Sequence, residues 1–274
     1  MTKLEYTPSP ELRHLQNVLL AMVLEIDALC RKHGITYYLN GGNALGAVRH
    51  KGYIPWDDDF DIMLRSKDYK RFLETCRREL DPQKWYVQQG GGHDWWSPHS
   101  KIRLRGTFLE DVGEWEGIPK ANRGIYIDVF ELTNAPKNPV SRKIQYAASK
   151  LLVSYGLHVK GYRTQSFSKR TVISISRILG WKPLYRLTER IVNRYENADT
   201  ELIGNFYGMS RYHNAFYPAS TFKEPLYLPF EGHELPVPTD IHNYLTMAFG
   251  DYMTPPPADK QIPEHSLSVD FGKY

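Results

Sequence analysis

Residues 38–62 decide the fold of this chain, and they read YLNGGNALGAVRHKGYIPWDDDFDI. The pattern predicts a short strand that ends at Gly41-Gly42, a short helix over 43–50, and a second strand over 60–64. Two adjacent glycines let backbone N–H groups approach an anion closely, and the following helix presents its positive N-terminus there. Because Gly-Gly turns are common, this feature alone indicates phosphate binding only weakly.

Closely spaced aspartates enter the second strand. Residues two apart on a strand share a face, so Asp59 and Asp61 point the same way, and Asp57 joins them if the extended backbone begins that early. Two such carboxylates repel each other by about 4 kcal/mol at about 4 Å in a dielectric of about 20. Protonation, a basic partner or a divalent cation can offset this repulsion, and oxygen-only ligands suit Mg²⁺. The alternative is a solvated acidic turn, which the apolar flanking residues disfavour.

A further acid, Asp128, lies inside the apolar stretch 125–130, where a second major strand is expected. A carboxylate in such a strand is costly unless it is paired or bound to metal. If this strand neighbours 60–64, Asp128 completes a cluster of three carboxylates. The alternative is an acid near a strand end that pairs with Arg123 or Lys101.

The rest of the chain alternates between strand-like and helical patterns. We expect helices from Pro10 to Gly34, from Ser66 to Leu80, from 139 to about 197 with breaks at Gly161 and Gly180, and over 241–249. Further strands are expected at 36–39, 85–89, 101–104 and 107–110, with a hairpin around Glu231-Gly232. The sequence therefore predicts an α+β protein, with a mixed β-sheet flanked by helices and a helical block in the second half. We expect a catalytic core over 1–136, a basic helical block or insertion over 137–200, and a segment over 201–274 that packs back on the core.

Composition and charge exclude several classes of protein. Of the 274 residues, 41% are hydrophobic and 24% are charged, values that rule out a disordered chain, a collagen and a coiled coil. No apolar run approaches the roughly 20 residues of a membrane span, and the start of the chain does not have the apolar core of a signal peptide. Cys30 and Cys76 have no metal-binding spacing. We expect a cytoplasmic location, with the inner face of the membrane as a place of action.

The formal net charge of +4 hides an asymmetry. Residues 137–194 contain 13 Lys and Arg but a single acid, Glu189, so this segment carries +12. It is either a solvated helical face or a region that contacts an anionic partner such as a membrane. The chain has no common nucleic-acid-binding motif, so nucleic acid is not expected as a partner.

Taken together, the Gly-Gly turn, the paired aspartates and Asp128 resemble the nucleotidyltransferase fold, and residues 38–62 closely resemble the LicD family. That family is similar to the phosphocholine transferases of bacterial envelope glycans and, more distantly, to fukutin-type proteins. The resemblance extends to residues 126–130 and to the tail around 237–255. It departs at Asn43, where the family often has Ser or Thr, and at Glu131, where Pro is expected.

The resemblance implies roles for individual residues. Those implied for metal binding are Asp57, Asp59, Asp61 and Asp128, of which Asp59, Asp61 and Asp128 are also catalytic. Those implied for substrate binding are Gly41, Gly42, Asn43, Arg49 and His50. For Arg49, a salt bridge to one of the neighbouring aspartates is the alternative.

The implied activity is a LicD-type phosphotransfer that depends on Mg²⁺ (or Mn²⁺). A CDP-activated donor passes phosphocholine, or a similar head group, to a sugar hydroxyl of teichoic acid, lipopolysaccharide or capsule, and CMP leaves. The acceptor is a free or lipid-linked glycan. The alternatives are a nucleotidyltransferase and a membrane-docking interaction protein. Proteins hold quaternary ammonium groups over aromatic faces. The candidates here are Trp56, Trp95, Trp96, Trp115 and Tyr126.

Overall fold

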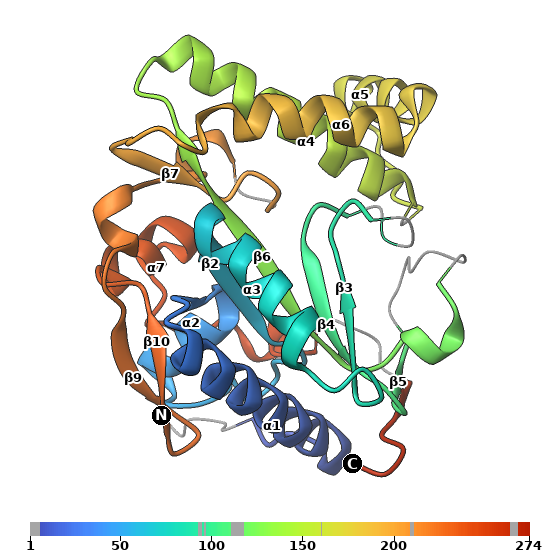
Figure 1. Cartoon of the computed structure of the whole chain (residues 1–274), viewed down its shortest axis with the longest axis vertical. Coiled ribbons are helices and arrows are strands. Elements are labelled where there is room, and N and C mark those ends of the chain that lie inside the picture. Colours follow the sequence, from blue (N-terminus) through green and yellow to red (C-terminus); the bar gives the residue numbers. More distant parts are fainter. Residues whose placement is uncertain are drawn as a thin grey trace.

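A mixed β-sheet forms the centre of the molecule in a computed structural model that describes residues 6–92, 95, 97–110, 118–159, 161–208, 211–263 and 268–274. The strands in the order β1-β2-β6-β4-β3 are Tyr38–Leu39, Asp61–Arg65, Tyr126–Ala135, Ser100–Leu104 and Trp85–Gln88. Only the central β2–β6 pair is parallel, and the other neighbours in this order are antiparallel. This arrangement confirms the predicted α+β fold with a mixed sheet (Figure 1).

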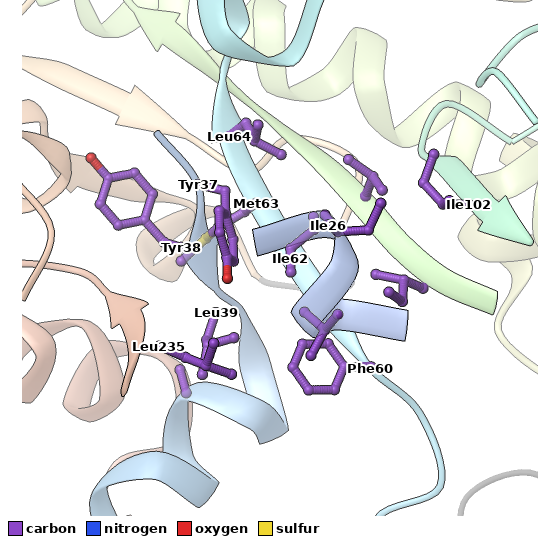
Figure 2. Close-up of a cluster of buried hydrophobic side chains, with 14 of the residues drawn as sticks. Ile26, Tyr37, Tyr38, Leu39, Phe60, Ile62, Met63, Leu64, Ile102 and Leu235 are labelled. Atoms are coloured by element: carbon purple, nitrogen blue, oxygen red, sulfur yellow. The ribbon is translucent and has the colours of Figure 1, made fainter. Parts of the chain in front are cut away.

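Helices α1 (Pro10–His33) and α3 (Ser66–Glu79) lie against one face of the sheet (Figure 1). Helix α1 begins as the sequence predicts: the Ser9 hydroxyl accepts a hydrogen bond from the Leu12 N–H, Pro10 is the first helical residue, and Gly34 ends the helix at φ 56°. Ile26 of α1 and Ile62 of β2 belong to one buried cluster (Figure 2). Because side chains alternate along a strand, Asp61 and Met63 point away from the face that Ile62 occupies.

The second half begins with the helical block α4 (Pro139–Val159), α5 (Phe167–Leu179) and α6 (Trp181–Val192). Gly161 and Gly180 both have positive φ at the predicted breaks. The three helices pack on one another at one end of the molecule, the top in Figure 1. The helical interpretation of this segment is thus confirmed.

The C-terminal segment returns to the core. Strands β7 (Leu202–Gly204) and β8 (Phe216–Pro218) extend the sheet from the far end of β6, and β11 (Val269–Asp270) pairs with β5 (Phe108–Leu109). The hairpin of β9 (Leu226–Phe230) and β10 (His233–Val237) turns at Glu231-Gly232, as predicted. Helix α7 (Ile241–Phe249) packs against α2 (Gly41–Arg49). The domain boundaries at 136 and 200 stay a prediction.

Five short 3₁₀ helices complete the described structure: η1 (Lys120–Asn122), η2 (Asn193–Tyr195), η3 (Tyr212–Asn214), η4 (Ala219–Phe222) and η5 (Ala258–Lys260). Across the described ranges, no helix has both the length and the apolar character that a bilayer crossing requires.

Candidate active site

Asp61 and Asp128 are direct partners across the parallel strands β2 and β6. Successive residues of a strand point to opposite faces, so Asp61 points away from Ile62, and its register partner Asp128 lies on the same face of the sheet as Asp61. The predicted adjacency of these two strands is confirmed. It follows that one face of the sheet centre brings together acids that are far apart in the sequence.

The Gly-Gly turn lies against the same acids. A Cβ added to Gly42 would lie 2.7 Å from Asp57 Oδ2, and one added to Gly41 would lie 3.7 Å from Asp61 Oδ2. Gly41 begins helix α2 in the left-handed region at φ 50°. The N-terminus of α2 therefore faces two carboxylates, which its positive end stabilises.

Asn43 connects α2 to the aspartate strand. Its side chain is fully buried, its Oδ1 accepts a hydrogen bond of 2.6 Å from the Asp61 N–H, and its Nδ2 donates to the Asp59 carbonyl at 3.4 Å. These bonds make Asn43 a positioning residue for the two acids. Direct contact of its side chain with phosphate stays a prediction.

Sequence reasoning missed two other positioning residues. The fully buried Gln16 of α1 donates from Nε2 to the Asp57 carbonyl at 2.9 Å. The Tyr244 hydroxyl donates to Asn40 Oδ1 at 2.7 Å and accepts from the Gly41 N–H at 3.0 Å. Gln16 was detectable, because it lies four residues after Leu12 and three before Leu19, on the apolar stripe of its helix.

A negative charge on Asp61 is unfavourable, because the side chain is buried among other carboxylates. Burial raises the pKa of Asp61 well above its usual value, the charges of Asp59, Asp128 and Asp57 raise it further, and Lys101 opposes them. In the part of the chain that the structure describes, no three His, Cys, Asp or Glu side chains are grouped to hold a metal ion as they stand. The site therefore has the oxygen ligands that a hard cation prefers, but not a closed chelating group.

Asp128 is paired with two basic side chains. Lys101 Nζ lies 3.0 Å from Asp128 Oδ1, and His99 Nε2 lies 3.3 Å from the same atom. Burial alone would raise the pKa of Asp128, but Lys101 and His99 outweigh it and hold this pKa below its usual value. The pairing with Lys101, one of the sequence alternatives, is confirmed. Arg123, the other alternative, instead donates to the Ile118 carbonyl.

His99 was not identified from the sequence. It lies two residues before Lys101, and this spacing could have indicated that both residues approach Asp128 from one face of the strand. Its ring also stacks at a tilt on Phe130, with the ring centroids 5.1 Å apart, and its Nδ1 is 2.7 Å from Ser97 Oγ. His99 thus fixes Asp128 and is itself held on both sides.

Two of the aromatic candidates contact this lysine. Lys101 Nζ lies 3.2 Å from the ring centroid of Tyr126 and 5.2 Å from that of Trp95. These rings form a cation-binding pair that a protein ammonium occupies. Trp56 instead makes edge contacts with Tyr6 and His50, at centroid distances of 5.7 and 6.4 Å. Trp96 and Trp115 lie outside the described residues.

Arg49 ends helix α2 beside the C-terminal segment. Its Nη1 donates to the Tyr252 carbonyl at 2.7 Å, and its Nε lies 3.5 Å from His50 Nδ1. Burial lowers the pKa of Arg49. Arg49 thus links α2 to the chain after α7 through a hydrogen bond. Its role in phosphate binding stays a prediction.

Known proteins are similar to this chain in sequence. The family model described as "LicD/FKTN/FKRP, nucleotidyltransferase domain" matches residues 34–138. The lipopolysaccharide cholinephosphotransferase LicD of Haemophilus influenzae is 28% identical to this chain over 93% of its length and 96% of that protein's. An uncharacterized protein of Rickettsia typhi is 41% identical over 20% of this chain and 18% of its own length. The predicted resemblance is confirmed.

Proposed function

We propose that this protein transfers phosphocholine from a CDP-activated donor to a sugar hydroxyl of a cell-envelope glycan and releases CMP, because residues 34–138 match the LicD/FKTN/FKRP nucleotidyltransferase model and the chain is similar to a cholinephosphotransferase along most of its length. The name of the Haemophilus relative supports the head group and lipopolysaccharide as the acceptor class. Teichoic acid and capsule are the other acceptor classes that fit the proposal.

The observation that carries the proposal is the register of Asp61 with Asp128 beside the N-terminus of α2. A helix N-terminus attracts phosphate, but this one already faces Asp57 and Asp61. A donor pyrophosphate next to these carboxylates would be repelled unless a cation lay between them. The arrangement therefore supports a phosphate substrate that binds together with a metal ion.

The residues present fit Mg²⁺ (or Mn²⁺) by their chemistry. Mg²⁺ usually takes one or two carboxylates and completes its shell with substrate phosphates and water, so it does not need a closed group of three protein ligands. We assign Asp59 and Asp61 as its ligands, with Asp57 as a further candidate. When bound, the ion neutralises charge on the pyrophosphate and on the leaving CMP.

In the proposed reaction the acceptor hydroxyl attacks the donor and gives up its proton to a side chain of the protein. The acceptor oxygen forms a bond to the phosphorus that carries choline, and the bond from that phosphorus to the CMP oxygen breaks. The acceptor's proton passes to a carboxylate of the cluster. We assign this role to Asp128, because Lys101 and His99 hold its carboxylate in a fixed position opposite Asp61.

Among the aromatic candidates that the structure describes, we assign Trp56 to the choline group, because it precedes Asp57 in the chain and because Lys101 already lies against Tyr126 and Trp95. One cation–π contact contributes about 0.5–2 kcal/mol, so Trp56→Leu should raise the KM for CDP-choline about 2- to 30-fold. Inhibition by CMP, which has no choline, should not change. Equal weakening of CDP-choline and CMP would instead place Trp56 at the nucleotide.

The direct test combines CMP release with the mass of the product. Protein, Mg²⁺, CDP-choline and a lipopolysaccharide fragment should yield CMP and an acceptor that is heavier by one phosphocholine, and a chelator should stop the reaction until Mg²⁺ is restored. Asp59→Asn should be inactive, whereas the exposed Asp259→Asn should be fully active.

Two outcomes contradict the proposal. An acceptor that gains a nucleoside monophosphate would show a nucleotidyltransferase, the activity after which the matching domain family is described. No CMP release with lipopolysaccharide, teichoic acid or capsule fragments would exclude this transfer.

A further inference from the structure

Helix α5 presents an apolar stripe to the outside of the molecule. Phe167 and Ile178 are 85% and 82% exposed, and Ile175 is 45% exposed. The spacing of Phe167, Thr171, Ile175 and Ile178 places them on one helical face. Ser176, on the opposite side of the helix, is fully buried. One apolar face of α5 thus points outward.

Other exposed apolar side chains gather on the same helical block. Of the large apolar side chains that are exposed in the described residues, those in this block are Val140, Ile144, Tyr162, Phe167, Ile175, Ile178, Leu179 and Leu187. In Figure 1 the three helices lie together at one end of the molecule. The block thus carries eight of the 13 large apolar side chains that are exposed in the described residues, although it makes up only part of the chain.

Charge identifies the kind of partner. Arg170 and Arg177 are exposed on α5, beside the apolar stripe. Residues 137–194 contain 13 Lys and Arg but one acid, so this segment is strongly basic. A helix with a protruding apolar face and flanking basic residues is typical of one that lies in the plane of an anionic membrane surface.

A cavity between α4 and α5 has the same chemical character. Its volume is about 530 Å³, and its walls combine apolar side chains such as Val153, Leu157 and Ile173 with the cations Lys150, Lys169 and Arg211. Lys150 donates to the carbonyls of Phe206 and Gly208, and burial lowers its pKa to about 8. Both the outer stripe and this cavity match an anionic amphiphile.

We propose that α5 docks the protein on the surface of an anionic membrane. Phe167, Ile175 and Ile178 enter the boundary between headgroups and acyl chains, and the neighbouring Arg and Lys side chains contact anionic headgroups. This inference uses residues outside the carboxylate cluster and does not depend on the proposed reaction. If both hold, docking brings the site to a surface where a lipid-linked acceptor would be found.

The test is flotation of the full chain with vesicles of phosphatidylcholine, with and without phosphatidylglycerol. The protein should float only with the anionic vesicles, and added salt should weaken binding by screening. Each basic residue near a membrane surface contributes about a factor of five, so Arg170→Gln with Arg177→Gln should weaken binding about 30-fold. Phe167→Ser with Ile178→Ser should weaken it at least about tenfold.

Matched controls separate docking from unfolding or self-association. Ile262→Ser and Met253→Ser change exposed apolar residues outside the helical block and should float like the unchanged protein. Circular dichroism and CMP release with a soluble acceptor should be unaffected in the α5 variants. The proposal is overturned if the unchanged protein does not float, if the α5 variants float equally well, or if sedimentation shows that those variants instead convert a dimer to monomers.

Discussion

Asp61 and Asp128 lie opposite each other in register on the only parallel strand pair of the central five-strand order, yet the chain treats them differently. Asp128 is paired with Lys101 and His99, whereas Asp61 is surrounded mainly by other acids. One carboxylate is therefore held ionised, and the other is left in need of a proton or a cation. Four predictions follow from this asymmetry and its surroundings.

Asp61→Asn should separate activity from stability. The rate of CMP release should fall at least about 10²-fold, because the variant lacks one proposed ligand of the metal ion. Its free energy of unfolding without metal should rise, since the like charges of Asp59, Asp128 and Asp57 no longer repel a buried carboxylate. The pKa of folded Asp61 is raised, so the unchanged protein loses this stability as pH rises, and the advantage of the variant grows with pH. Urea unfolding over a pH series checks this, and a destabilised variant would contradict it.

Lys101→Met should be strongly destabilising. Only 3% of the Lys101 side chain is exposed and 15% of that of Asp128, so removal of the lysine leaves a buried carboxylate without its main partner. Breaking a buried pair in this way costs about 3–5 kcal/mol. The double variant with Asp128→Asn should recover much of the loss, measured as the free energy of unfolding in urea. Losses that simply add would show that the two residues do not interact.

Gly42→Ala should reduce activity more than stability. The three atoms nearest to the new Cβ all belong to the Asp57 carboxylate, the closest at 2.7 Å, and this short side chain can rotate away. Alanine in a helix also gains about 1 kcal/mol over glycine, which offsets the clash. Gly46→Ala is the matched contrast, because its Cβ would lie 2.3 Å from the Gly52 backbone carbonyl oxygen and should cost about 1–3 kcal/mol. Thermal unfolding and CMP release, measured on both variants, distinguish the two effects.

Glu131→Gln should stabilise the protein only at higher pH. Burial raises the pKa of Glu131 to about 7, so the folded protein holds a proton there that the unfolded chain loses at lower pH. The stability contributed by this protonated form is complete below the unfolded pKa and is lost as pH rises through about 7. The unfolding midpoint of the variant should therefore exceed that of the unchanged protein at about pH 8 and match it near pH 4. Equal differences at both pH values would contradict the assignment.

Much of the local structure follows from the sequence, as individual residues show. Ser9-Pro10 and Gly34 delimit α1, Gly161 and Gly180 divide the helical block, and Glu231-Gly232 forms the hairpin turn. Each of these depends on the conformational preferences of a few consecutive residues. The Gly41-Gly42 turn is also predictable from a few consecutive residues, and the aspartates follow it closely in the sequence.

Other parts of the site depend on contacts between residues far apart in the sequence. The Tyr244 hydroxyl reaches Asn40 from a helix some 200 positions away, and Gln16 supports Asp57 from the first helix. No local pattern predicts which hydroxyl or amide will meet which backbone group. Such partners are chosen when helices pack on the sheet.

By itself the sequence determined most of the helices and strands and the turn that lies against Asp57 and Asp61, because periodicity and turn chemistry act over short stretches of chain. Only the tertiary structure decided that Asp128 takes Lys101 and His99 as partners, that Lys101 lies against the aromatic pair, and that α5 turns its apolar stripe outward. The physical reason is that strand register and helix packing, which no short segment encodes, set which side chains share a low-dielectric environment and which remain in contact with water.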